Sequence, residues 1–593
     1  MNIVLVAINA KYIHSNLAVY SLKAYAEKYA KNENIEIEIA EYTINQTEDE
    51  VLRNLYERKA DILAFSCYIW NLQMTKHVIE NMKKVAPNVS IYMGGPEVSY
   101  NAKEFLLQNN EVEGIMRGEG EKIFANFVTA VSEENRPIPN LSNIKGMVYR
   151  SASGEIIENE LESPLDMSDI PFVYKDLKRF ENKIMYYETS RGCPFSCSYC
   201  LSSIDKKLRF RNLSLVKEEL KFFIDNKVAQ VKFVDRTFNC KKDHAIEIWK
   251  FIKEHDNGIT NFHFEVAADL MTDEEIEIIK DMRPGLIQLE IGVQSVNEMT
   301  ISAINRKTNL DKIREKVAKI KSFGNVHQHL DLIAGLPYED YDSFANSFNQ
   351  VYAMKPDQLQ LGFLKVLYGS NMKLMSGEYG IKYLSYPPYE VLETKWISYE
   401  DVLKLKEVEE VVEIYYNSFQ FSNSVMYLEK MFETPFEFYE ELGTFYKANS
   451  MNGEKHSRIA RYILLRKFAE LLIKEENRPI DINKFDELLT LDVYLRENIK
   501  TRPLFAKDIN NFKKEKQSIY RNEKIYEVIP AYRDYDSKQI AKMTHIEVFE
   551  RIYEAQSNPK YILFDYKDRN ALNSEANTID VTNLVERFGG NND

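Results

Sequence analysis

The sequence predicts an α/β protein with three parts: a doubly wound parallel sheet, a partial barrel of six strand–helix units, and a mostly α-helical C-terminal domain. Three observations lead to this prediction. Short apolar runs alternate with longer stretches of helical spacing over residues 1–135. The alternation starts again near residue 184 and continues to about residue 375. From residue 385 onward the apolar residues have almost entirely helical spacing.

The first part is expected to contain five parallel strands with helices between them. In such sheets, ligands bind in the loops at the carboxyl ends of the strands. The expected strands are residues 3–8, 35–40, 61–66, 89–93 and 114–116. The corresponding loops, which we expect to form a binding edge, are residues 9–15, 67–71, 94–97 and 118–121.

Residues 136–182 are predicted to be a linker, because prolines occur near both ends and residues 151–155 have the composition of a hairpin turn. The second domain is expected to span residues 183–384. Its six strand–helix units fit an open (β/α)₆ barrel, with reactive residues at the carboxyl ends of the strands. The expected strands are residues 184–189, 230–235, 261–266, 286–291, 328–333 and 358–363.

Residues 385–593 are expected to be a mostly helical domain with no recognisable motif. Two short β-prone stretches occur in it, at residues 525–528 and 561–566.

Three cysteines follow the first strand of the second domain in the spacing CxxxCxxC: Cys193, Cys197 and Cys200. Iron–sulfur clusters of the [4Fe–4S] type usually take four thiolates, so three would leave one iron open to another ligand. A zinc site would need a further ligand such as histidine, and the nearest one is His244. The spacing therefore favours an iron–sulfur cluster with an open iron as the metal site.

This pattern resembles the radical S-adenosylmethionine (SAM) enzymes, in which the open iron binds SAM and the aromatic residue at the position of Tyr199 lies near adenine. The resemblance implies a SAM pocket built from later strand ends. Asp235 and Thr237 lie in the turn that contacts the SAM amino group in this family, although no glycine occurs there. The remaining predicted SAM contacts are Glu265 and Asp331 for the ribose, and Gln294 and Arg306 for the ribose and carboxylate.

A doubly wound, Rossmann-like domain before such a barrel resembles the cobalamin-binding radical SAM group. Methylthiotransferases also have an N-terminal domain, but they need three more cysteines there, and this chain has only Cys67. The DxHxxG motif that supplies a cobalt ligand is absent, so cobalamin is expected to bind without histidine on cobalt. The predicted cobalamin contacts are Gly94, Gly95, Glu119, Tyr68 and Asn71.

The resemblance implies that the cluster cleaves SAM reductively to a 5′-deoxyadenosyl radical, with cobalamin supporting C-methylation of an unknown substrate. Two alternatives stay open at this point: a radical SAM enzyme without cobalamin, and a non-catalytic iron–sulfur or SAM-binding sensor protein. The implied partners are the substrate and a low-potential electron donor such as a ferredoxin or flavodoxin.

Composition limits these functions further. The net charge of −14 argues against a broad nucleic-acid-binding surface. No uninterrupted apolar run reaches the roughly 18 residues of a membrane span. Five cysteines in 593 residues, together with the expected cluster, favour a reducing cytoplasm.

Overall fold

The structure is a computed structural model that describes residues 1–449, 451, 453, 456–553 and 559–585. The chain forms two compact units. The first unit comprises Met1–Ser343 and Gly362–Tyr399, and the second comprises Phe344–Leu361 and Glu400–Asp593. Among the described residues, no helix combines the length and apolar character that crossing a bilayer requires.

The N-terminal sheet of the first unit has seven strands in the order β2-β1-β3-β4-β5-β6-β7. The first five pair in parallel, as the sequence predicts. Because β2 and β3 lie on opposite sides of β1, the direction of winding reverses between β1 and β3. The bounds are β1 Asn2–Asn9, β2 Glu36–Thr43, β3 Ile62–Ser66, β4 Ser90–Gly94, β5 Gly114–Met116, β6 Met147–Arg150 and β7 Ile156–Glu158.

Helices cover both faces of this sheet, and each face has its own apolar core. The strands are nearly continuous apolar runs because both of their faces are buried. Residues 151–155 form the predicted hairpin turn, but its strands β6 and β7 add antiparallel to β5 and extend the sheet. The helices are α1 Leu17–Tyr29, α2 Glu48–Glu57, α3 Leu72–Val85, α4 Pro96–Ser99, α5 Ala102–Gln108 and α6 Gly120–Glu134.

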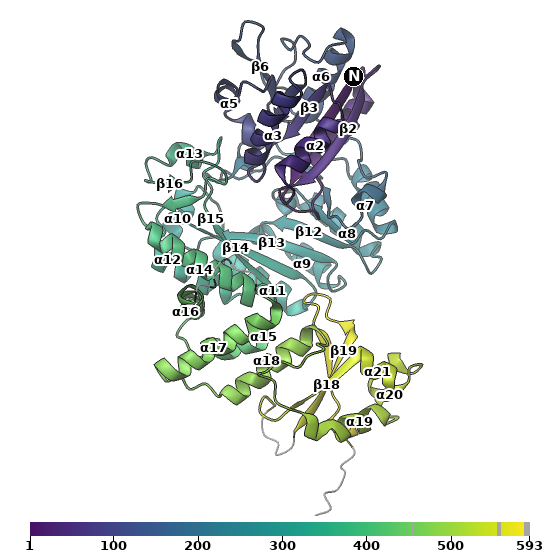
Figure 1. The fold of residues 1–593 in the computed structure, drawn as a ribbon, viewed down its shortest axis with the longest axis vertical. Coiled ribbons are helices and arrows are strands. Elements are labelled where there is room, and N and C mark those ends of the chain that lie inside the picture. The colour runs from purple at the N-terminus through teal and green to yellow at the C-terminus, as the bar shows by residue number, and fades with distance from the viewer. Residues whose placement is uncertain (450, 452, 454–455, 554–558, 586–593) are drawn as a thin grey trace, which may run out of the picture. The chain divides into compact units, whose positions relative to one another are not determined.

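The second sheet has six strands in the order β15-β14-β13-β12-β11-β8, with α8, α9 and α11 among the helices that follow its strands (Figure 1). Side chains on one face, such as Phe264 and Leu289, are fully buried. Those on the other face include Lys232, His263 and Glu290, so the barrel interior is polar. The strands are β8 Met185–Tyr187, β11 Gln230–Phe233, β12 Asn261–Val266, β13 Ile287–Gln294, β14 His327–Ala334 and β15 Gln358–Phe363.

The helices α7 Leu213–Asp225, α8 Lys242–Glu254, α9 Asp273–Lys280, α11 Leu310–Phe323 and α12 Tyr341–Tyr352 connect these strands. The six strands expected from the sequence are therefore present, with helices between them. The carboxyl ends of the strands carry the loops that follow residues 187, 233, 266, 294 and 334.

The second unit is mostly helical, as predicted, and ends in an antiparallel sheet of three strands, β18-β19-β20. Residues 561–566 lie in β19, which confirms that strand prediction. Its larger elements are α14 Tyr399–Tyr415, α15 Ser422–Glu429, α16 Pro435–Ala448, α17 Arg458–Glu476, α18 Ile482–Arg496, β18 Thr544–Phe549, β19 Lys560–Arg569 and β20 Ala576–Asp580.

The other β-prone stretch is not a strand. Residues 525–528 form the short helix α20 Ile525–Val528. Ile525 and Ile529 are four residues apart and bury the same side in a cluster with Ile540 and Leu563. Tertiary packing therefore outweighs the β propensity of this segment.

Candidate cluster and cofactor site

The three cysteines lie on a loop between two short strands, β9 Ser190–Arg191 and β10 Arg209–Phe210, which pair antiparallel. Gly192 has φ +91°, and a Cβ there would lie 2.7 Å from the carbonyl oxygen of Lys207. Only glycine fits this turn. The Cys193 amide donates to the carbonyl of Asp205 at 2.9 Å, so the loop closes on itself immediately before the first thiol.

Cys193 and Cys197 are buried, and Cys200 is half-buried. The thiol of Cys193 lies 3.8 Å from the Thr237 hydroxyl, and Nη1 of Arg306 lies 3.8 Å from Sγ of Cys197. Burial raises the pKa of the Cys197 thiol, and Arg306 opposes that shift. Within the described parts of the chain, no three His, Cys, Asp or Glu side chains converge as the ligands of one ion would. The thiolates of a [4Fe–4S] cluster need no such convergence, since each binds a different iron.

Arg306 connects the cysteine loop to the fourth barrel strand, β13. Its Nη1 donates to the Tyr199 hydroxyl at 3.3 Å, and Nη2 donates to the Gly292 carbonyl at 2.5 Å. Its Nε is buried and has no hydrogen-bond partner among the residues that the structure describes. A buried donor without a partner is costly. The guanidinium therefore fits an anionic ligand such as the SAM carboxylate.

Gln294 reaches the same place because the β13 backbone is irregular there. The pairing with β14 shifts register between Gly292 and Gln294, and Gln294 has φ +75°. A Cβ on Gly292 would lie 2.3 Å from Nε2 of Gln294 and 3.3 Å from the Arg306 guanidinium. Left-handed backbone at a bulge is a common feature of functional sites. Here it places Gln294 beside Arg306.

A pocket at the carboxyl ends of the barrel strands brings most predicted SAM contacts together. Thr237, Glu265, Gln294, Arg306 and Asp331 line it beside Cys197. The other lining residues were not among the predicted contacts, although several lie close to them in the sequence. They are Phe195, Arg236, Val266, Ala267, Asp269, Glu290, Gly292 and Lys307.

Burial and charge divide the pocket carboxylates into two classes. Burial raises the pKa of Glu265 to about 7, and the Arg236 guanidinium, 3.9 Å away, opposes that shift. Burial acts in the same direction on Glu290, but His263 at 3.0 Å and Lys232 at 3.1 Å outweigh it and lower the pKa of Glu290 to about 2. One carboxyl therefore titrates near neutral pH, while the other stays ionised.

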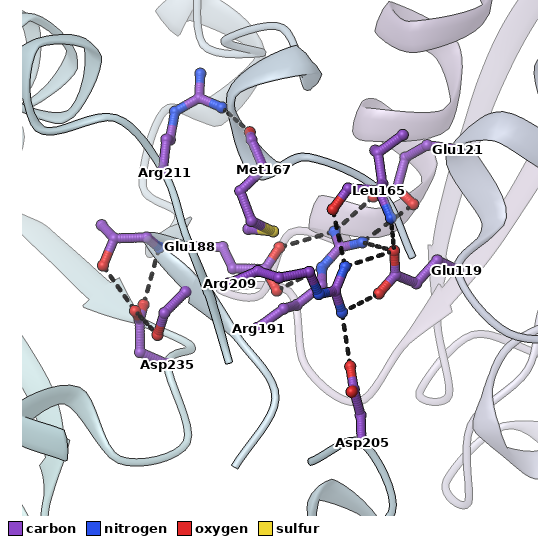
Figure 2. A network of polar contacts seen from close by, with 12 residues as sticks. Glu119, Glu121, Leu165, Met167, Glu188, Arg191, Asp205, Arg209, Arg211 and Asp235 are labelled. Atoms are coloured by element: carbon purple, nitrogen blue, oxygen red, sulfur yellow. Dashed lines mark hydrogen bonds and ion pairs between the residues drawn. The ribbon is translucent and has the colours of Figure 1, made fainter. Parts of the chain in front are cut away.

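Asp235 and Tyr199 are predicted contacts that do not line this pocket. The buried Asp235 carboxylate accepts hydrogen bonds from the Thr189 amide at 3.0 Å, the Thr189 hydroxyl at 2.7 Å and the Ser190 hydroxyl at 2.5 Å (Figure 2). It thereby ties the end of β11 to the strand that leads into the cluster loop. Tyr199 packs beside the apolar cluster that contains Ile304.

The edge of the N-terminal sheet carries an aromatic pair where the winding reverses. Tyr68 and Trp70 stack with ring centroids 4.4 Å apart and an interplanar angle of 6°. Trp70 is 43% exposed, and its Nε1 donates to the Ile8 carbonyl at 3.1 Å. The point where the winding reverses is the usual ligand site of a doubly wound sheet. The exposed ring of Trp70, supported by the half-buried Tyr68, suits a large planar ring such as a corrin.

Asn71 and Gly95 shape this edge through contacts within the protein. Asn71 is fully buried and donates to the carbonyls of Ile8 at 3.0 Å and Ser66 at 2.9 Å. Gly95 has φ +103°, and a Cβ there would lie 2.4 Å from the Cys67 carbonyl oxygen. Gly94 ends β4 beside it. Contacts of these residues with cobalamin stay predictions, as does that of Glu119, whose carboxylate binds arginines described below.

The N-terminal domain also contacts the edge strand of the barrel. The Ile184 amide, next to β8, donates to the Ile13 carbonyl at 2.8 Å. His14 Nδ1 lies 2.6 Å from the Tyr186 hydroxyl on β8. Burial, with Lys11 and Lys232, lowers the pKa of His14, so the ring is neutral near pH 7. This histidine faces the barrel through Tyr186.

Comparisons with known protein families agree with this geometry. Residues 3–128 match the B12 binding domain, and residues 187–351 match the radical SAM superfamily. The chain thus contains a B12-binding domain followed by a radical SAM domain. Residues 377–564 match a protein of unknown function (DUF4080). The radical SAM match implies a [4Fe–4S] cluster and SAM in this protein, and the B12-binding match implies cobalamin.

Curated relatives of this radical SAM protein are distant. Over 327 residues, covering 53% of this chain and 58% of the relative, it is 22% identical to the anaerobic magnesium-protoporphyrin IX monomethyl ester cyclase of Rubrivivax gelatinosus. Over 309 residues, covering 49% and 44%, it is 26% identical to the cobalamin-dependent radical SAM methyltransferase TokK of Streptomyces tokunonensis. The chain thus spans about half the length of these relatives.

A solved structure of the cobalamin-dependent S-adenosylmethionine radical enzyme OxsB, with aqua-cobalamin and S-adenosylmethionine bound, has a similar fold. Its TM-score is 0.56 at 14% identity, over 82% of this chain and 78% of OxsB. At 14% identity, the structural similarity to OxsB supports the fold alone, which combines a B12-binding domain, a radical SAM barrel and a further domain.

Proposed function

We propose that this protein is a cobalamin-dependent radical SAM methyltransferase that methylates an unactivated carbon of its substrate. One observation carries the proposal. A single compact unit holds the three-thiol loop, the pocket with Arg306 and Glu265, and the aromatic edge of the B12-binding domain. When bound, the cluster and SAM supply a 5′-deoxyadenosyl radical, and cobalamin carries the methyl group.

The pocket residues bind and orient SAM in this proposal. Arg306 holds the SAM carboxylate through its fork, next to the Cys197 thiolate that binds the cluster. Glu265 and Gln294 accept and donate hydrogen bonds at the ribose. Glu265 must be ionised to accept hydrogen bonds from both ribose hydroxyls, and burial makes ionisation costly near neutral pH. Arg236 lowers that cost from the rim of the pocket.

The B12-binding domain places cobalamin at the sheet edge formed by the loops after β1 and β3. Tyr68 and Trp70 provide the planar surface, and Asn71 fixes the loop that carries them. His14 contacts Tyr186, which supports binding of cobalamin without a protein histidine on cobalt.

The proposed reaction needs an electron source and a reducing compartment. A low-potential donor such as a ferredoxin or flavodoxin would reduce the cluster near Cys200, the most exposed of the three cluster cysteines. A cluster with an open iron persists only where oxidants are scarce. We therefore place the protein in the cytoplasm.

Anaerobic reconstitution tests the proposal. The protein is loaded with iron, sulfide and hydroxocobalamin and is then given SAM and a low-potential reductant. Methyl transfer predicts a bound corrin spectrum, 5′-deoxyadenosine and S-adenosylhomocysteine. A protein that forms 5′-deoxyadenosine and binds no corrin would instead be a radical SAM enzyme without cobalamin. A protein that binds cluster and SAM but cleaves no SAM with any reductant would fit the sensor alternative.

A further inference from the structure

A dense network of charged side chains joins the B12-binding domain to the cluster loop (Figure 2). Glu119 is the N-cap residue of α6 and Glu121 lies in its first turn, shortly after β5. Arg191 and Arg209 come from β9 and β10, the paired strands on either side of the cysteines. The network therefore connects segments that are 70 to 90 residues apart in the sequence.

Arg191 binds carboxylates from both domains, and Glu119 of the N-terminal domain also lies 3.5 Å from its Nη1. Its Nη2 donates to Glu121 at 2.5 Å, and its Nε and Nη2 each donate to Glu188 at 2.9 Å. The exposed fraction is 19% for the Arg191 side chain and 7% for that of Glu121. These are charge-assisted hydrogen bonds with little solvent, the kind that carries most energy and geometric specificity.

Arg209 repeats the arrangement on the neighbouring strand. It forms a two-pronged ion pair with Glu119 and also donates to Asp205 at 2.6 Å. Glu119 further accepts from the Leu165 amide at 3.0 Å. Although burial opposes ionisation, the Arg209 and Leu165 hydrogen bonds and the nearby Arg191 lower the pKa of Glu119. The carboxylate is therefore ionised at neutral pH.

Both arginines act on the segment that holds the first thiol. Arg191 is two residues before Cys193, and the Cys193 amide donates to the carbonyl of Asp205, whose carboxylate binds Arg209. In the N-terminal domain, Glu119 and Glu121 follow the strand β5, whose carboxyl end lies at the predicted cobalamin-binding edge of the sheet. A shift of α6 would therefore move charges that hold the cluster loop.

We propose that the Glu121–Arg191 and Glu119–Arg209 pairs form a clamp that fixes the spacing between the corrin-binding edge and the cluster loop. The four side chains are positioning residues, and the clamp is needed for methyl transfer more than for SAM cleavage. SAM cleavage uses only groups of the barrel, whereas methyl transfer uses both domains. The link to methyl transfer rests on the proposed function; the clamp itself does not.

A matched pair of variants tests the clamp on one guanidinium. Glu121→Gln removes the nearer of the two Arg191 partners in the B12-binding domain and leaves Glu119 at 3.5 Å. Glu188→Gln removes the partner that belongs to the barrel. Both substitutions keep the size of the side chain and each deletes one carboxylate from Arg191. The double variant Glu119→Gln/Glu121→Gln opens both arms of the clamp.

The first measurement needs no cofactor. Hydrogen exchange of residues 189–193 is compared in the three variants and the unmodified chain. We expect exchange to rise by about tenfold or more in the double variant, because losing one partner of a buried charge pair costs several kcal/mol. We expect a rise of less than about threefold in Glu188→Gln, since the bond between domains persists there. An equal rise in exchange in Glu188→Gln and the double variant, or no rise in the double variant, would overturn the clamp.

The second measurement uses the loaded protein. Dipolar coupling between Co(II) cobalamin and the reduced cluster, read by pulsed electron paramagnetic resonance, gives the distribution of their spacing. We expect a single narrow distribution that persists in Glu188→Gln and broadens in Glu121→Gln and the double variant. S-adenosylhomocysteine formed per 5′-deoxyadenosine should fall by about tenfold in the double variant, the effect of about 1.4 kcal/mol. Unchanged spacing and an unchanged product ratio would refute the positioning role.

Failure of the proposed function is distinguishable from failure of the clamp. If the unmodified protein binds no corrin or forms no 5′-deoxyadenosine, the proposed function is wrong. The exchange measurement on the cofactor-free chain then still decides whether Glu119 and Glu121 hold the cluster loop.

Discussion

SAM binding should depend on pH through a single carboxyl, that of Glu265. Burial raises its pKa to about 7, from a usual value of 4.5. Between these two pH values the chain takes up a proton at Glu265 when it folds. Protonation of Glu265 therefore stabilises the folded chain fully below about pH 4.5, and this stabilisation is lost as the pH rises through about 7. The difference between the two pKa values of Glu265 corresponds to about 3 kcal/mol of folding free energy, at 1.36 kcal/mol per pKa unit.

The size of the effect on SAM follows from the same value. If only the ionised carboxylate accepts both ribose hydroxyls, the apparent affinity scales with the ionised fraction. That fraction is about one-eleventh at pH 6 and ten-elevenths at pH 8 for a pKa of about 7. SAM should therefore bind about tenfold more tightly at pH 8 than at pH 6.

Anaerobic calorimetry with the oxidised cluster measures this binding without cleavage. Glu265→Gln should bind SAM more weakly and lose the pH dependence. Glu290→Gln is the matched control in the same pocket, because the pKa of Glu290 is lowered to about 2 and it stays ionised throughout. The control should keep a pH dependence of SAM binding, with its midpoint at lower pH and a smaller change between pH 6 and pH 8, since the Glu290 charge raises the pKa of Glu265. The reasoning is refuted if Glu265→Gln retains the pH dependence.

Three further predictions concern single side chains. Cys197→Ala should abolish both the cluster, measured as iron and the visible spectrum, and 5′-deoxyadenosine formation; retention of either contradicts the thiolate assignment. Arg306→Lys should weaken SAM binding by about tenfold to a hundredfold, because an ammonium cannot replace the planar fork, whereas an unchanged binding isotherm would exclude the carboxylate contact. Glu219→Gln should cost about 3–5 kcal/mol in urea unfolding of the cofactor-free chain, because it leaves the buried Arg211 guanidinium without its anion. Replacing both by Met and Leu should recover most of that loss, and a double variant no more stable than Glu219→Gln would contradict the buried-charge explanation.

Local sequence signals predicted much of the candidate site. The three cysteines and Tyr199 lie within eight residues, so their spacing alone indicates the cluster loop. The resemblance to radical SAM enzymes predicted Glu265, Gln294, Arg306 and Asp331 as SAM contacts. The structure brings them to one pocket, because the strand ends of a barrel meet at one rim.

Other assignments depended on contacts that no local pattern contains. Asp235 follows the second barrel strand, β11, yet its carboxylate accepts hydrogen bonds from Thr189 and Ser190, which are 46 and 45 residues away in the sequence. Glu119 resembles a cofactor contact by motif, but its carboxylate binds Arg209, 90 residues later. Distant partners decide these roles, and the sequence does not state which distant charges meet.

The sequence by itself determined the order of the domains, the strand ends and the thiolate spacing, because each depends on residues close together in the chain. The tertiary structure decided three further features: the opposite pKa shifts of Glu265 and Glu290, the bulge that turns Gln294 toward Arg306, and the ion pair between Glu121 and Arg191. Burial and charge pairing arise only when separate segments exclude water together, and these effects exist only in the folded chain.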